Sequence, residues 1–98
     1  MSDIFVSKKA QNEIEKSFIW YQKRSSIIAD SFVKELNKKF DELGKHPLRY
    51  SIKKRPYRET ILTKFPFLII YKYYRLKKVV LIISVFHFKR NPIKKYRK

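Results

Sequence analysis

Residues able to transfer a proton and to bind phosphate gather near the end of the chain. His87, Lys89 and Arg90 follow a long apolar run, and Tyr96 lies in the basic stretch after it. Neighbouring cations lower the pKa of an imidazole, so His87 is a candidate general base. The Arg90 guanidinium suits phosphate groups of a nucleic acid, and the Tyr96 ring suits an unpaired base. The alternative is a histidine that ends a strand and hydrogen-bonds the backbone, and the residues alone favour this alternative slightly.

Charge points to a polyanionic target or an acidic protein partner. The net charge is +17, and residues 45–98 hold seventeen Lys or Arg against one acid, whereas residues 1–44 are nearly balanced, with eight against seven. So one-sided a field favours a nucleic acid or an acidic protein over a merely lysine-rich surface. The predicted target-binding residues are Lys53, Lys54, Arg55, Arg58, Lys89, Arg90 and Arg97.

Several kinds of chemistry are disfavoured by composition. The chain has no cysteine, two histidines and one glycine, so we expect no metal site, no phosphate-binding glycine loop and no cofactor. A nucleophile–histidine–acid triad is disfavoured because Glu59 is the only acid in the second half. The longest apolar run, Val79–Phe86, is too short for a membrane helix, and Met1–Ala10 lacks the apolar core of a signal peptide. We therefore expect a cytoplasmic protein with no membrane partner.

The first half of the chain predicts a short strand followed by two helices. Asp3–Val6 is the strand, and Ser7 and Ser25 are candidate N-caps. Apolar residues recur at helical spacing in both helices, and Trp20 lies off the narrow stripe, so we expect it to pack under a neighbouring element. We expect Gly44 to end the second helix in a left-handed conformation. The two stripes are Ala10, Ile14, Phe18 and Tyr21, then Ile28, Phe32, Leu36, Phe40 and Leu43.

The second half predicts an antiparallel meander. Residues 45–57 form a basic connection without a clear period, and Arg58–Thr63, Phe67–Tyr74 and Val79–Phe88 read as strands. Pro66 belongs at a strand start, and Arg75–Lys78 is short enough for a hairpin loop. Strict alternation in the last strand would put Val79, Leu81, Ile83, Val85 and His87 on one face and Val80, Ile82, Ser84, Phe86 and Phe88 on the other.

These elements define an α+β fold in one domain covering residues 1–98. A short N-terminal strand and a two-helix hairpin pack on an antiparallel β-meander. This order resembles the RelE/ParE toxin superfamily, with Ala29–Phe32 and Leu36 in the second helix, Phe65–Tyr71 in the sheet and Val85–Pro92 at its end. The resemblance implies a small basic bacterial toxin, neutralised by a cognate antitoxin in a type II module, with a toxin–antitoxin hetero-oligomer expected.

The superfamily divides by target. Its RelE-like branch cleaves messenger RNA on the ribosome without metal, and its ParE-like branch poisons DNA gyrase. The ribonuclease branch often has an arginine in the central strand where this chain has Leu68, and the Phe-Pro-Phe and His-x-x-Arg-x-Pro patterns look more like the ParE side. The resemblance therefore favours DNA gyrase as target. A RelE-like endoribonuclease using His87, Arg90 and Tyr96 stays open, as does a non-toxic nucleic-acid-binding module.

Overall fold

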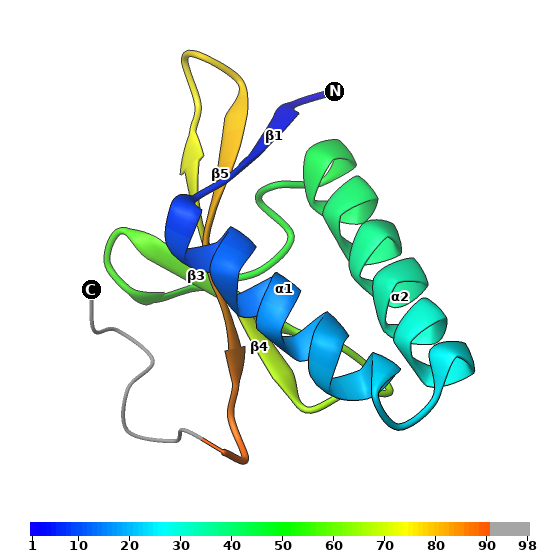
Figure 1. The fold of residues 1–98 in the computed structure, drawn as a ribbon. Coiled ribbons are helices and arrows are strands. Elements are labelled where there is room, and N and C mark those ends of the chain that lie inside the picture. Colours follow the sequence, from blue (N-terminus) through cyan, green and yellow to red (C-terminus); the bar gives the residue numbers. More distant parts are fainter. Residues whose placement is uncertain (91–98) are drawn as a thin grey trace.

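A computed structural model describes residues 1–90, in which two helices lie beside a five-stranded sheet (Figure 1). The elements are β1 (Asp3–Val6), α1 (Lys8–Gln22), α2 (Ser26–Lys45), β2 (Ile52–Lys54), β3 (Tyr57–Ile61), β4 (Phe67–Tyr74) and β5 (Val79–His87). Their order confirms the predicted α+β fold, with the N-terminal strand, the helical hairpin and the meander. The pair Asn91-Pro92, which by its residue types predicts a turn, lies outside the described residues.

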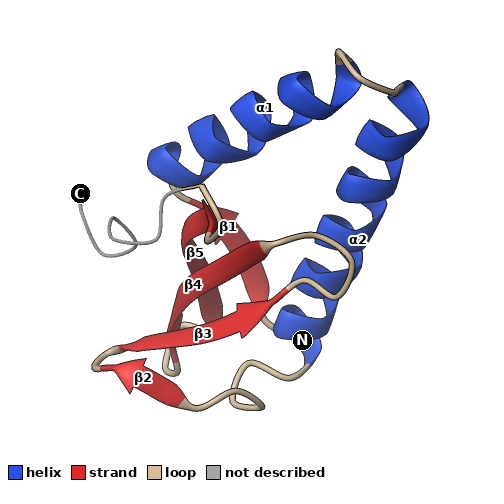
Figure 2. Ribbon diagram, turned by 90° about the horizontal axis from the view of Figure 1, so that it is seen from below, coloured by secondary structure: helices blue, strands red, loops and turns tan. Residues whose placement is uncertain are grey.

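Both helices begin at the predicted serines. The Ser7 hydroxyl accepts a hydrogen bond from the Ala10 backbone N–H at 3.1 Å, and the Ser25 hydroxyl accepts one from the Ile28 N–H at 3.3 Å. These bonds satisfy backbone donors that have no partner within the helix. Both helices cover the same face of the sheet (Figure 2), so their apolar stripes are turned toward the strands.

Gly44 does not end the second helix, and that prediction was wrong. It lies inside α2 without a positive φ, and the helix continues to Lys45. Its backbone carbonyl accepts a hydrogen bond from the Ser2 N–H at 2.9 Å. A Cβ at this position would lie 3.1 Å from the Ser2 carbonyl oxygen, so the glycine permits the start of the chain to approach the helix.

The sheet has the strand order β1-β5-β4-β3-β2. Strand β1 runs parallel to β5, with Ile4 opposite Val80, and the other neighbouring pairs are antiparallel. Edge strand β2 falls in the segment predicted as a connection without structure. Its three residues are all exposed, so no alternation of apolar and polar residues marked it as a strand.

A bulge in β5 overturns the predicted strict alternation. Ile70 pairs with Ser84 and Tyr71 pairs with Ile82, so Ile83 is an extra residue opposite the β4 backbone. An extra residue shifts every later side chain to the other face of the sheet. Val85 therefore joins Val80 and Ile82 in the core beneath the helices, although strict alternation would separate them.

The core is centred on an aromatic cluster where the helices meet β4. Phe32 of α2 and Phe67 of β4 are fully buried, with ring centroids 5.0 Å apart. Tyr21 of α1 lies 5.3 Å from Phe32, and Phe65 contacts both Tyr21 and Phe32 with its ring steeply inclined to theirs. Such inclined contacts contribute stabilisation beyond the area that they bury. The cluster therefore fixes the hairpin on the sheet.

A second set of contacts holds the segment between α2 and β2. The Glu42 carboxylate accepts hydrogen bonds from Tyr50 and Arg49, each at 2.6 Å, and forms an ion pair with Lys39 at 3.1 Å. Burial alone would raise the pKa of Glu42, but the hydrogen bonds from Tyr50, Lys39 and Arg49 lower it to about 2. The contribution of the ionised Glu42 carboxylate to folding stability is therefore fully present above its unfolded pKa near 4.5. That contribution is lost as the pH falls toward 2.

Phe32→Ala is expected to lower the free energy of unfolding by ~3–5 kcal/mol, because it leaves a cavity in the buried aromatic cluster. Lys34 lies two residues further along α2 and is exposed. Lys34→Ala should change the free energy of unfolding by less than ~0.5 kcal/mol. Urea unfolding followed by circular dichroism measures both values. Equal effects of the two substitutions would contradict the orientation of α2.

Candidate phosphate-binding surface

His87 ends β5 and is packed against the aromatic cluster. It lies opposite Phe67 in the β4–β5 ladder, and the two ring centroids are 5.0 Å apart in an edge-on contact. Its Nδ1 atom accepts a hydrogen bond from the Arg90 backbone N–H at 3.0 Å. An acceptor Nδ1 in a neutral imidazole leaves the proton on Nε2. In this arrangement neither ring nitrogen has a free lone pair with which to act as a base.

The environment of His87 favours its neutral form. Burial lowers the pKa of His87 below its usual value of 6.5, and the positive charges of Arg90 and Lys89 lower it further. Both causes act against a second proton on the ring. The imidazole therefore carries no charge at neutral pH and adds no cation to the surface around it.

Arg90 and Arg24 lie against one indole ring, an arrangement that the sequence analysis missed. The guanidinium carbon of Arg24 is 3.4 Å from the centroid of the Trp20 ring, and that of Arg90 is 4.9 Å from it. Trp20 is 38 % exposed, so the prediction that it packs under a neighbouring element was wrong. Trp20 lies in the last turn of α1 and Arg24 two residues after its end, and this spacing of four residues was a signal in the sequence for their contact.

The other predicted target-binding residues lie elsewhere. Lys53, Lys54 and Arg55 are exposed at edge strand β2 and the turn after it, and Lys89 is exposed beside Arg90. Arg58 is half-buried and donates a hydrogen bond from Nη1 to the Tyr50 carbonyl oxygen at 2.6 Å, so it supports the loop before β2. Tyr96 and Arg97 lie outside the described residues.

These basic residues do not form one cluster. His87 pairs with Phe67, and Arg58 pairs with Tyr71, four residues further along β4. Four residues of a strand correspond to roughly 13 Å, and the β2–β3 turn lies beyond Arg58. The structure therefore brings His87 and Arg90 together and places Lys53–Arg55 apart from them.

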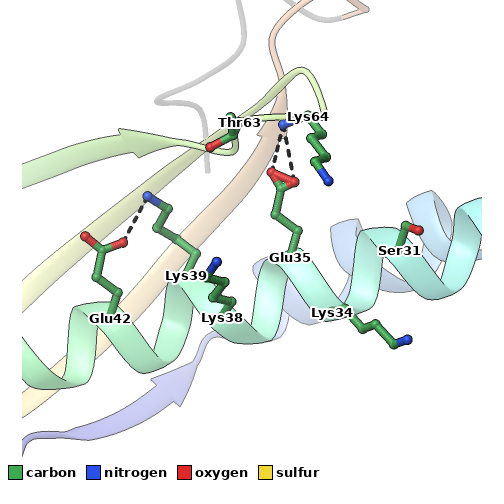
Figure 3. A pocket seen from close by; sticks show the side chains of 8 residues that line it. All are labelled: Ser31, Lys34, Glu35, Lys38, Lys39, Glu42, Thr63 and Lys64. Carbon is green, nitrogen blue, oxygen red and sulfur yellow. Dashed lines mark hydrogen bonds and ion pairs between the residues drawn. The ribbon is translucent and has the colours of Figure 1, made fainter.

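A groove of about 480 Å³ lies between α2 and the loop that joins β3 to β4 (Figure 3). Its lining residues are Ser31, Lys34, Glu35, Lys38, Lys39, Glu42, Thr63 and Lys64. The Glu35 carboxylate points across it and accepts a hydrogen bond from the Lys64 backbone N–H at 2.8 Å. Two of the four lysine charges are offset by Glu35 and Glu42, and no predicted site residue lies in this groove.

Metal chemistry has no evident place in the described part of the chain. Among residues 1–90, no group of three or more His, Asp or Glu side chains is arranged to hold a metal ion. In the same residues, neither helix has the length and apolar character needed to cross a membrane. The surface around Trp20, Arg24 and Arg90 offers positive charge, an exposed aromatic ring and hydrogen-bond donors. Cationic hydrogen-bond donors suit phosphate oxygens.

The fold is shared with solved toxin structures. The chain is similar to a protein in the structure "Chromosomal ParDE TA system from P. aeruginosa", with a TM-score of 0.73 and 15 % identity over 87 % of this chain and 94 % of that chain. It is similar to a chain of the intact E. coli RelBE toxin–antitoxin complex, with a TM-score of 0.62 and 20 % identity over 87 % and 94 %. It is also similar to the isolated E. coli RelE toxin, with a TM-score of 0.60 and 18 % identity over 97 % and 98 %.

These likenesses show that the chain shares its fold with proteins of solved toxin–antitoxin structures. The family model described as the ParE toxin of type II toxin–antitoxin system, parDE, matches residues 4–92. This chain belongs to that family and is a ParE/RelE-type toxin of a type II toxin–antitoxin system. No curated protein matches its sequence.

Arg90→Gln is expected to raise the pKa of His87, because it removes the nearer of two cations that disfavour protonation. The value should stay below 6.5, since burial against Phe67 is the larger cause and is unchanged. NMR titration of the imidazole Cε1–H measures the shift, with Arg75→Gln in the β4–β5 hairpin as the matched control. No difference between the two variants would contradict the placement of Arg90 beside His87.

Proposed function

We propose that this toxin acts without catalysing a reaction and inhibits DNA gyrase, and that a cognate antitoxin neutralises it. The observation that carries the proposal is the state of His87, the one histidine expected to transfer protons. Its Nδ1 is occupied by the Arg90 N–H, and its ring is half-buried against Phe67. A general base needs a free lone pair within hydrogen-bond reach of the proton that it removes.

The central strand supports the same choice. Leu68 occupies the position where RNA-cleaving relatives often have an arginine, and it pairs with Ile61 on one side and Phe86 on the other. These three neighbours form an apolar row across β3, β4 and β5. A cleavage site for RNA needs cations placed where charge develops on the phosphate, and this row supplies none. The match to the ParE family model is consistent with gyrase as the target.

The alternative is a metal-independent, ribosome-dependent messenger RNA endoribonuclease. Arg90 favours it, because its side chain lies at the end of β5 beside His87 and is exposed to a ligand. In that mechanism His87 would have to release the Arg90 N–H before accepting a proton. The two mechanisms therefore differ in what the removal of His87 does.

His87→Ala should leave growth arrest within about twofold of the parent toxin if gyrase is the target, since no proton transfer is lost. In a ribonuclease the same change should lower cleavage by ~10²–10⁴-fold. The measurements are growth arrest at matched expression, DNA supercoiling by purified gyrase with added toxin, and primer extension on a ribosome-bound message. Site-specific cleavage by the parent that disappears in His87→Ala, with supercoiling unaffected, would refute the proposal.

The antitoxin is expected to be a small acidic or amphipathic protein that binds tightly enough to co-purify. A net charge of +17 favours such a partner through long-range attraction. Co-expression of the small reading frame adjacent to the toxin gene should restore growth, and affinity purification should recover both chains. An antitoxin from an unrelated module is the control. A neighbour that neither co-purifies nor restores growth would count against the toxin–antitoxin pairing.

A further inference from the structure

We propose that Arg24 and Arg90, both held against Trp20, form a clamp that binds phosphate groups of a nucleic-acid backbone. The clamp joins the C-terminal end of α1 to the end of β5. Arg24 and Trp20 were not among the residues that the sequence suggested for target binding. The inference does not depend on whether gyrase or the ribosome is the target, because it concerns direct contact between this chain and nucleic acid.

Arg24 is held at two points. Its guanidinium carbon is 3.4 Å from the Trp20 ring centroid, and its Nη1 donates a hydrogen bond to the Trp20 carbonyl oxygen at 2.9 Å. Stacking on an aromatic ring restricts the guanidinium group without using its in-plane N–H donors. Less side-chain entropy is therefore lost when those donors bind a ligand.

Arg90 brings a second guanidinium group to the same indole ring. Its guanidinium carbon is 4.9 Å from the same centroid, so the separation of the two carbons cannot exceed the sum of the two distances. Two like charges this close repel each other unless an anion lies between or beside them. Guanidinium groups bind phosphate oxygens through paired N–H donors, which suits a phosphodiester.

No carboxylate of the described chain neutralises the clamp. The ion pairs among residues 1–90 join Lys9 to Glu13, Lys39 and Arg49 to Glu42, and Lys45 to Asp41, and none includes Arg24 or Arg90. Residues 91–98 contain neither Asp nor Glu. Within residues 1–90, both guanidinium groups of the clamp are therefore without a carboxylate partner.

The surroundings favour nucleic acid over an acidic peptide. Lys23 and Lys89 are exposed next to the two arginines in the sequence and extend the row of cations. Trp20 is 38 % exposed and Phe88 is 39 % exposed. Exposed rings beside cations are how proteins hold unpaired bases and the backbone that joins them.

The test is binding of fluorescein-labelled oligonucleotides to the full-length toxin, followed by anisotropy over a range of salt concentrations. Arg24→Gln and Arg90→Gln should each weaken binding roughly tenfold at low salt, as expected for a charged hydrogen-bonding partner. Each should also reduce the slope of log K against log salt by about 1. Arg75→Gln removes the same charge from the far end of the β4–β5 ladder, and its effect should be below about twofold.

Trp20→Leu separates positioning from charge. It keeps both arginines, so the salt slope should stay at the parent value while the affinity falls, because the guanidinium groups are no longer held. Circular dichroism of each variant confirms folding. Arg24→Lys keeps the charge without the planar donors and should preserve the salt slope while binding more weakly than the parent.

The probes distinguish the source of the phosphate. Single-stranded RNA and duplex DNA of equal length are compared, with inorganic phosphate as competitor. Weaker binding of either probe, or of both, by Arg24→Gln and Arg90→Gln supports the clamp. Arg24→Gln and Arg90→Gln variants that bind both probes no more weakly than Arg75→Gln would overturn it. The same holds if the substitutions weaken only the antitoxin complex, because the pair would then bind carboxylates.

Discussion

The pairing of β4 with β5, including its bulge, is the constraint on which the rest of the structure depends. These strands pair from Phe67 opposite His87 to Tyr74 opposite Val79, and they contribute most of the buried side chains of the sheet. Without the extra residue Ile83, His87 would point away from the helices. With it, His87 contacts Phe67, and the chain beyond it passes close enough to α1 for Arg90 to reach Trp20. One inserted residue therefore determines which groups meet at the candidate site.

The helices and the three inner strands could be predicted because their side chains repeat with clear periods. Ser7 and Ser25 mark the helix starts, and Phe32, Leu36 and Leu43 of the predicted second stripe are buried. Ile28, which was predicted on the same stripe, is 44 % exposed. The bulge has no such mark, because Val79–Phe88 is apolar on both faces and either register buries apolar side chains. Gly44 was misplaced for a related reason, since glycine permits both a helix end and a close approach of another segment, and only the position of Ser2 decides between them.

The candidate site could be predicted only in part. His87 and Arg90 were found because they are close in the sequence and follow a strand. Trp20 belongs to α1 and Arg24 to the turn after it, and their meeting with Arg90 depends on the path of the chain after the bulge. Predicting that Trp20 is covered followed the usual tendency of large aromatic rings to be buried. In this structure the Trp20 ring contacts two guanidinium groups and is partly exposed to solvent.

Carboxylates of the helical half also hold the second half of the chain in place. Glu13 of α1 accepts hydrogen bonds from the Ser84 hydroxyl at 2.9 Å and the Val85 N–H at 3.0 Å, beyond the point where β1 stops pairing with β5. Glu35 of α2 binds the Lys64 N–H, and Glu42 binds Arg49 and Tyr50. The helix acids are thus used to hold the basic half. Arg24 and Arg90, beyond the ends of α1 and β5, form no ion pair with a carboxylate of residues 1–90. The basic surface thus lies where these bridging carboxylates do not.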